Sequence, residues 1–330
     1  MALFDLPLDQ LERYTPDVPE PADLDAFWAD TLAAARLHAP VVALERVPTG
    51  LALVDTWDLT FSGFDGHPVR AWYSRPRGTA GGDLPVVVEL VGYGRGRGLP
   101  HERLLWSAAG YAHLLVDSRG QGSQYGNGGD TPDPVPSPPA VPGFVTRGIG
   151  DPATYYYRRL ITDAARAVDA VRALDGVDAA GIVTTGNSQG GGMALAVAGL
   201  VPDLAATMPH VPFLCHVQRA LGLTDADPYG EIVRYLAVQR GAVADVLRTL
   251  SYVDGVGFAR RARAKALFGV GLRDTVCPPS TVFAAYNAYA GDRSIEVYPF
   301  NHHEGGDAFH TRRQVEWLAD AVPTPLAARA

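Results

Sequence analysis

Short runs of consecutive apolar residues recur along the chain and predict strands buried on both faces of a sheet. Parallel strands covered by helices have such continuous runs instead of alternating ones. The runs are at 84–92, 111–117, 180–186, 264–272 and 294–300. Helical patterns separate them, most clearly over 156–174. Alternating strands and helices predict right-handed βαβ units, and so an α/β fold with a mostly parallel, doubly wound sheet flanked by helices.

The N-terminal third has a different pattern. Strand-like segments at 52–62 and 69–76 flank the sequence GFDGHP, where Asp65-Gly66 is typical of a hairpin turn. Residues 1–40 are predicted to be an acidic helical segment, with Asp23 as the N-cap of a helix over LDAFWADTLAAARLH.

Two longer segments interrupt the strand and helix series. The stretch 126–143 is too rich in proline and glycine for a helix or a central strand, so it is predicted to be a long loop, within a Pro/Gly-rich segment over 126–150. A surface linker and a functional loop both remain open for it. The stretch 213–262 is predicted to be a helical insertion over the sheet edge. No second domain boundary is convincing, which predicts one domain over 1–330.

Composition narrows the class of function. A net charge of −8 argues against a general nucleic-acid binder or a protein that binds acidic membranes. Two cysteines in 330 residues form no disulfide framework, which favours a reducing compartment. The N-terminus lacks the basic and apolar regions of a signal peptide, and no apolar run reaches the length of a membrane span. We therefore expect a cytoplasmic protein.

Ser188 is the strongest chemical signal. It lies in Gly186-Asn187-Ser188-Gln189-Gly190, a G-x-S-x-G sequence with a predicted strand before it and a predicted helix after it. That context is the one in which a nucleophile elbow lifts a serine hydroxyl into the open, and the glycines give the turn room. The backbone N–H of Gln189 at the helix start can face a developing oxyanion.

A nucleophilic serine needs a base that is held by an acid, and on this kind of sheet the acid and then the base follow the serine in the chain. Of the later histidines, only His302 and His303 come directly after the final predicted strand. Spacing alone leaves open which of the two is the base. Asp274, just past a buried strand and before Pro-Pro, is the predicted acid. The competing carboxylates Asp225, Asp227, Asp245 and Asp254 fall in the helical insertion or in turn-like settings.

The glycine-rich turn GYGRGRG after the run 84–92 is predicted to aim the backbone N–H of Tyr93 at the same site, as a second oxyanion donor. A phosphate-binding turn is the rival interpretation, but no G-x-G-x-x-G opening a helix and no GK[ST] is present. His302, His303 and Glu304 are adjacent and not one helical turn apart, so they do not present a metal-ligand face. We therefore predict no metal and no cofactor.

Taken together, these motifs resemble the acetyl xylan esterases and cephalosporin C deacetylases, carbohydrate esterase family seven of the α/β hydrolases. The resemblance rests on RGQG at 119–122, GNSQGG at 186–191, RDTVCPPST at 273–281 and NHHEGG at 301–306, and it extends over roughly 20–320. It implies an α/β-hydrolase fold. The combined motifs are far more specific than G-x-S-x-G alone.

The resemblance implies a role for each matching residue. Ser188 is then the nucleophile, Asp274 the acid and His303 the base, with the N–H groups of Tyr93 and Gln189 as the oxyanion hole. Arg119, Gln121 and Glu304 are implied as structural supports of the active-site loops. The family also implies a cytoplasmic hexamer, a trimer of dimers, with the 126–150 segment used for subunit contact and access to the site.

The predicted activity is that of a serine carboxylesterase. Its expected substrates are small acetylated molecules: acetylated xylo-oligosaccharides, acetylated sugars or cephalosporin C. A serine peptidase or an acyltransferase on the same fold remains an alternative. A non-catalytic hydrolase scaffold is disfavoured, because that interpretation predicts a missing triad member and none is missing. No nucleic-acid or membrane partner is expected.

Overall fold

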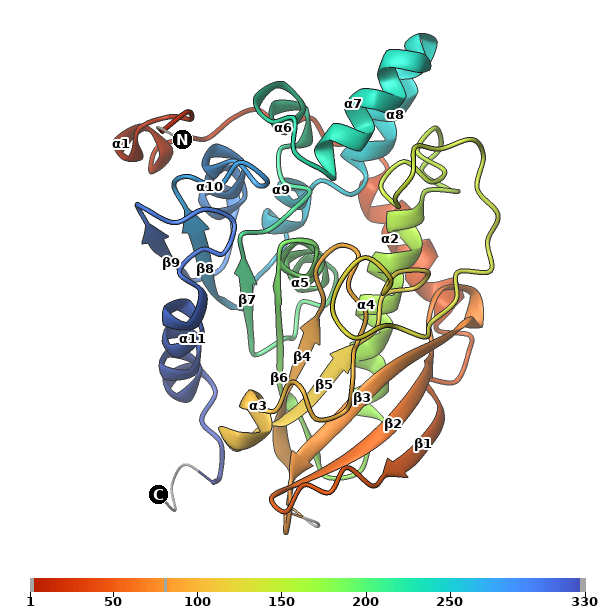
Figure 1. The fold of residues 1–330 in the computed structure, drawn as a ribbon, viewed down its shortest axis with the longest axis vertical. Helices are drawn as coiled ribbons and strands as arrows, with labels where there is room; N and C mark the ends of the chain where they lie inside the picture. The colour runs from red at the N-terminus through yellow and green to blue at the C-terminus, as the bar shows by residue number, and fades with distance from the viewer. Residues whose placement is uncertain (1–2, 80–81, 327–330) are drawn as a thin grey trace.

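This computed structural model describes residues 3–79 and 82–326. All nine strands within these residues join one sheet (Figure 1). Their order across the sheet is β1-β2-β3-β5-β4-β6-β7-β8-β9. The strands are β1 (Val41–Val47), β2 (Val54–Ser62), β3 (Pro68–Pro76), β4 (Leu84–Leu90), β5 (Ala112–Val116), β6 (Val177–Asn187), β7 (Ala206–His210), β8 (Lys265–Gly271) and β9 (Arg293–Tyr298). From β5 through β9 in this order, neighbouring strands are parallel. The predicted α/β fold with a mostly parallel sheet is confirmed.

The remaining strands form an antiparallel extension of the sheet. β2 and β3 make the predicted hairpin, and Asp65 turns the chain with a left-handed φ of 54°. β3 then pairs with β5, and β1 adds the outer edge. β1 was not predicted from the sequence. Val42 and Leu44 on this strand are exposed, so it lacks the continuous burial that marks the inner strands.

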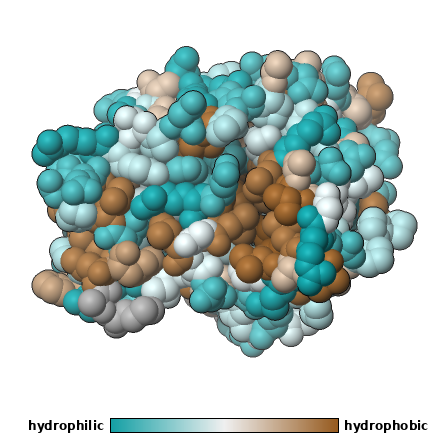
Figure 2. Space-filling view, turned by 90° about the horizontal axis from the view of Figure 1, so that it is seen from above, coloured by the Kyte–Doolittle hydropathy of each residue, from teal (hydrophilic) through white to brown (hydrophobic). Residues whose placement is uncertain are grey.

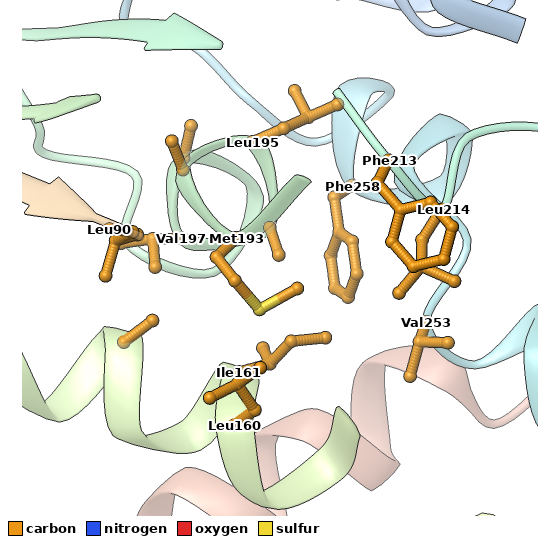
Figure 3. Close-up of a cluster of buried hydrophobic side chains, with 14 of the residues drawn as sticks. Leu90, Leu160, Ile161, Met193, Leu195, Val197, Phe213, Leu214, Val253 and Phe258 are labelled. Atoms are coloured by element: carbon orange, nitrogen blue, oxygen red, sulfur yellow. The ribbon is translucent and has the colours of Figure 1, made fainter. Parts of the chain in front are cut away.

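Helices cover both faces of the sheet. One side carries α4 (Tyr156–Arg172) and α5 (Gln189–Leu200), which pack on the strands around β6. Figure 3 shows Met193 of α5 pointing toward Ile161 of α4 within the buried cluster on this side. The other side carries α3 (Leu105–Ala108) and α11 (Asp307–Ala321) over a smaller cluster that includes Val87 and Val183. The remaining flanking helices are α1 (Leu8–Leu11), α2 (Leu24–Ala35) and α10 (Pro279–Ala288).

The structure corrects one detail of the N-terminal prediction. Asp23 does occupy the N-cap position of α2, but its side chain makes no cap hydrogen bond. Instead, its carboxylate accepts a hydrogen bond from the Tyr252 hydroxyl, with the two oxygens 2.6 Å apart. A contact with a residue 229 positions away replaces the local one. Within the first forty residues, only α1 and α2 are helical in the described part.

The helical insertion over 213–262 is confirmed. It consists of α6 (Val217–Leu223), α7 (Tyr229–Val238), the 3-10 turn η2 (Arg240–Ala242), α8 (Val243–Ser251) and α9 (Gly255–Ala259), and it lies between β7 and β8 in the chain. In Figure 1 these helices lie above the carboxyl ends of the parallel strands. Figure 2 views the molecule from that side and shows a hollow in which hydrophobic side chains gather.

The long loop is confirmed as well. Between β5 and α4 no described residue belongs to a helix or a strand. The proline-rich part is mostly exposed, whereas Val145 and Ile149 near its end are buried. No helix among the described residues combines the length and apolar character needed to cross a membrane.

Candidate active site

Ser188 lies in a strained turn between β6 and α5, as the G-x-S-x-G pattern predicts. Its φ of 59° and ψ of −117° are rare for a residue with a side chain, and such strain is characteristic of functional sites. The turn is held on both sides of the serine. The Ser188 N–H donates to the carbonyl of His210 at 3.0 Å, and the Ser188 carbonyl accepts from the N–H of Phe213 at 3.0 Å.

The glycines around Ser188 permit close backbone packing. A Cβ atom at Gly190 would overlap with the carbonyl of Leu90 at the end of β4, and one at Gly186 would overlap with the backbone of Gly190. The helix start is therefore pressed against the neighbouring strands. This contact explains the crowding of glycines around the serine.

Asp274 and His303, the predicted acid and base, lie in hydrogen-bonding contact. Asp274 follows β8 and is fully buried, while His303 lies in the loop between β9 and α11. Nδ1 of His303 lies 2.8 Å from Oδ2 of Asp274. Since a carboxylate can only accept, Nδ1 carries the proton, and Nε2 is left with a lone pair that can take a proton from a nucleophile. Of the two candidate histidines, His303 is thus the one that contacts the acid.

Backbone donors hold Asp274 in place. Its other oxygen, Oδ1, accepts from the N–H groups of Val276 at 2.8 Å and Cys277 at 2.9 Å. Pro278 is the N-cap of α10, and Pro279 is its first residue. The carboxylate therefore points Oδ2 at the imidazole without further freedom.

The competing carboxylates have other roles or positions. Asp254 is buried, and it accepts hydrogen bonds from the backbone N–H groups of His216, Val217 and Val256, which makes it a helix cap. Asp227 forms an exposed ion pair with Arg234. Asp245 lies in the first turn of α8.

Hydrogen bonds within the loop between β9 and α11 hold the segment that carries His303. Glu304 accepts hydrogen bonds from Nδ2 of Asn301 at 2.9 Å and from the N–H of His302 at 3.1 Å. Gly305 and Gly306 have φ values of 50° and 89°, which is why glycines follow the histidine pair. The His302 side chain is exposed, and its carbonyl accepts the N–H of Gly305.

The two predicted oxyanion donors leave adjacent strands at the same edge of the sheet. Leu90 of β4 pairs with Gly186 of β6, so the segments that carry Tyr93 and Gln189 emerge side by side. Gln189 is the first residue of α5, and its N–H therefore has no acceptor inside the helix. Within the described residues, the N–H of Tyr93 makes no hydrogen bond.

Gln121 connects these two segments. Its Oε1 accepts the N–H of Gly94 at 2.6 Å, and its Nε2 donates to Oε1 of Gln189 at 2.9 Å. Nε2 also lies 2.8 Å from the hydroxyl of Tyr156 in α4. One buried amide thus joins the loop after β4, the nucleophile elbow and α4.

Arg119 connects the long loop to α4. Its guanidinium is fully buried and forms a bidentate pair with Asp163 of α4, with Nη2 2.6 Å from Oδ1. It also contacts Asp133 of the loop at 3.3 Å, and Asp133 pairs in turn with Arg159. These contacts place Arg119 in a buried ion-pair network and not against the triad.

The Tyr93 side chain forms a buried junction that the sequence did not predict. The phenol oxygen accepts the backbone N–H groups of Phe144 at 2.5 Å and Val145 at 3.1 Å, and it donates to Glu231 of α7 at 2.8 Å. Burial raises the pKa of Glu231 to about 7, and the nearby Asp227 adds to the effect. Nothing in the local sequence YGEIVRYL marks this glutamate as buried.

Cys277 brings a third potential metal ligand close to the acid and the base. In the described part of the chain, ligand atoms of Asp274, Cys277 and His303 lie within 4.8 Å of one another. Burial raises the pKa of the Cys277 thiol, a shift that a hydrogen bond with Ser188 opposes. Metals bind the thiolate, so the protonated thiol is a poor ligand at neutral pH. The Cys277 thiol is thus affected by Ser188 and lies close to both Asp274 and His303.

The sheet and its helices are those of an α/β hydrolase, with a serine at the strained turn after β6 and a hydrogen-bonded Asp274–His303 pair in the loops after β8 and β9. The family model described as acetyl xylan esterase (AXE1) matches residues 1–321. The chain belongs to this family of hydrolytic esterases.

Solved structures agree with the family. An acetyl xylan esterase from Paenibacillus sp. R4 is 38% identical with a TM-score of 0.90, covering 96% of this chain and 99% of that one. Acetyl xylan esterase 1 from Thermoanaerobacterium sp. JW/SL YS485 is 32% identical with a TM-score of 0.84, with the same two coverages. Acetyl esterase Axe7A of Xylanibacter ruminicola is 25% identical over 294 residues, which are 88% of this chain and 65% of that longer protein.

Proposed function

We propose that this protein is a serine esterase that removes O-acetyl groups from small acetylated substrates through an acyl-enzyme. Acetylated xylo-oligosaccharides, acetylated sugars and cephalosporin C are the candidate substrates. The observation that carries the proposal is the Nδ1 to Oδ2 contact of 2.8 Å between His303 and Asp274, beside a serine in a strained strand-to-helix turn. Membership in the acetyl xylan esterase family supports the acetyl group as the acyl part.

In the proposed reaction, Nε2 of His303 takes the proton of Ser188 as the serine oxygen attacks the acetyl carbonyl. The N–H groups of Tyr93 and Gln189 hold the oxyanion that forms. The alcohol then leaves with the proton from His303. Asp274 keeps the imidazole in the required tautomer and stabilises its cation. Water, activated by the same imidazole, attacks the acetyl-serine, and acetate is released.

Gln121 is a proposed support of the oxyanion hole. Gln121 holds Gly94, the neighbour of Tyr93, and Gln189 at the same time, so both proposed oxyanion donors depend on one side chain. Such fixed donors need no reorganisation as charge develops, and losing one donor costs roughly 10²–10³ in turnover.

We also propose a cytoplasmic hexamer in which the 126–150 segment forms subunit contacts. The support is the exposure of its proline-rich part together with the anchoring of Val145 at Tyr93. Light scattering on the wild type and on a variant with 134–140 shortened tests this assembly. An unchanged mass in the shortened variant would contradict the role of the loop.

The activity is tested by acetate release from a panel of substrates, with wild type and Ser188→Ala side by side. The panel contains 4-nitrophenyl acetate and butyrate, acetylated xylobiose, cephalosporin C and a peptide amide. We expect acetyl-ester turnover that falls by a factor on the order of 10⁴ or more in the variant. Amide cleavage faster than ester cleavage would favour a peptidase. Ester turnover that survives the substitution would refute Ser188 as the nucleophile.

A further inference from the structure

His210 contacts both sides of the proposed triad without belonging to it. It is the last residue of β7, the strand beside β6 (Figure 1). In the sheet it pairs with Asn187, the residue before the proposed nucleophile. Its carbonyl accepts the N–H of Ser188 at 3.0 Å. The backbone of His210 therefore fixes the start of the nucleophile elbow.

The His210 side chain reaches the loop that carries the base. Its Nε2 lies 2.9 Å from the carbonyl oxygen of Gly305, two residues after His303. Since a carbonyl only accepts, Nε2 must carry the hydrogen. Nδ1 is then the acceptor for Nδ2 of Asn187, 3.3 Å away. The contacts on both ring nitrogens thus specify one tautomer and one orientation.

The surroundings leave the ring no alternative position. His310 of α11 stacks on it with the ring centroids 4.0 Å apart and the planes at 19°. A Cβ atom at Gly269 of β8 would lie 2.5 Å from Cδ2 of His210, and a Cβ atom at Gly305 would overlap with Nε2. Glycines at these two positions provide the space that the imidazole fills.

The ring must stay neutral to keep these contacts. The titratable groups that face it are His303, Asp274 and Asp307 toward the base loop and His310 on the stacked side, which in turn contacts Tyr298. Burial lowers the pKa of His210 to about 4 and that of His310 to about 2. Two cations stacked at this distance would repel each other, so the buried pair is uncharged at neutral pH.

We propose that His210 is a positioning residue of the esterase reaction: its carbonyl holds Ser188 while its ring holds the loop of His303, and together they set the separation of nucleophile and base. The inference rests on the proposed function, because it takes Ser188 and His303 as the reacting pair. A misplacement of about 1 Å between such groups costs on the order of 10² in rate.

A matched pair of variants tests this role. The amide nitrogen of glutamine can take the place of Nε2, whereas that of asparagine can only take the place of Nδ1. We therefore expect His210→Asn to lower kcat for 4-nitrophenyl acetate about 10- to 100-fold, and His210→Gln to stay within about fivefold of wild type, both with little change in KM. His113→Asn removes another buried imidazole, on β5, and serves as the control with kcat within about twofold.

A second measurement does not depend on turnover. The low-field proton NMR signal of the hydrogen between His303 and Asp274 should shift or broaden in His210→Asn and persist in His210→Gln. Turnover by Ser188→Ala tests the proposed function separately. If that function fails, the NMR comparison of the two His210 variants still shows whether His210 positions the loop of His303. Equal kcat values and equal NMR signals in the two His210 variants would overturn the proposal.

If neither His210 variant folds, as judged by circular dichroism, Asn187→Ala replaces them. This substitution removes only the Asn187 amide that donates to Nδ1 of His210. Asn187 is exposed, so the change should not disturb the core. The expected result is a kcat about three- to tenfold lower, because the ring loses one of its two restraints. An unchanged kcat and an unchanged proton signal in this variant would also overturn the proposal.

Discussion

Replacing Gln121 with leucine should weaken both the fold and the proposed oxyanion hole, by amounts that follow from its hydrogen bonds. The change removes the bonds to Gly94, Tyr156 and Gln189. The Tyr156 hydroxyl keeps its bond to the Arg119 carbonyl at 2.6 Å, and Oε1 of Gln189 keeps the Tyr157 hydroxyl at 3.0 Å. Only the N–H of Gly94 is left without a partner.

The expected loss in the free energy of unfolding is about 2–6 kcal/mol. An orphaned buried donor contributes about 1–3 kcal/mol of this loss, and each of the two other bonds contributes about 0.5–1.5 kcal/mol. Because Gly94 adjoins Tyr93, the proposed oxyanion donor should also move, and we expect kcat to fall about 10- to 100-fold with KM nearly unchanged.

Urea unfolding measures the first quantity, and hydrolysis of 4-nitrophenyl acetate by the folded variant measures the second. Gln314→Leu is the control, since this glutamine is similarly buried but makes only a 3.4 Å contact with Thr185. It should lose less than about 1 kcal/mol and keep its kcat. A Gln121→Leu variant with reduced stability and a kcat within twofold of wild type would refute the link between this amide and the oxyanion hole.

Two further predictions concern the acid and the buried glutamate. Asp274→Asn should keep the fold and lower kcat about 10⁴-fold, because the amide nitrogen would face Nδ1 of His303 and favour the wrong tautomer. The carboxyl of Glu231 ionises near pH 4.5 when unfolded and near 7 when folded. Its contribution to stability is therefore complete below pH 4.5 and lost as the pH rises through 7. Glu231→Gln should raise the melting temperature relative to wild type at pH 8.5 and not at pH 4.

Steady-state kinetics with circular dichroism tests the first of these predictions, and thermal unfolding at the two pH values tests the second. An Asp274→Asn variant with a kcat within tenfold of wild type would contradict the tautomer argument. A stabilisation by Glu231→Gln that is equal at both pH values would show that the ionisation of this carboxyl is not its cause.

Most inner strands could be predicted from the sequence because burial on both faces leaves a continuous apolar run. The runs at 84–92 and 264–272 correspond to β4 and β8. β7 was missed, since five residues that include Pro209 give no pattern long enough to recognise. β1 was missed for a different reason: an edge strand needs little burial, and its apolar residues are partly exposed.

The candidate site could be predicted where chemistry restricts the order of residues along the chain. A nucleophile elbow requires glycines around Ser188, and the acid and base must follow on later strands. The choice between His302 and His303 could not be made from spacing, because either could reach the edge of the sheet. The hydrogen bond to Asp274 distinguishes them, and it depends on how the loop after β9 is held.

The contacts that no local pattern could indicate are those between distant segments. Glu231 is 138 positions from Tyr93, yet the phenol joins it to the end of the long loop. A phenol oxygen can donate once and accept twice, and here all three capacities are used. The long loop and the helical insertion therefore meet at the side chain of the residue whose backbone N–H is the proposed oxyanion donor. A movement of either segment must displace that ring or break a buried hydrogen bond, which couples both segments to the chemistry at Ser188.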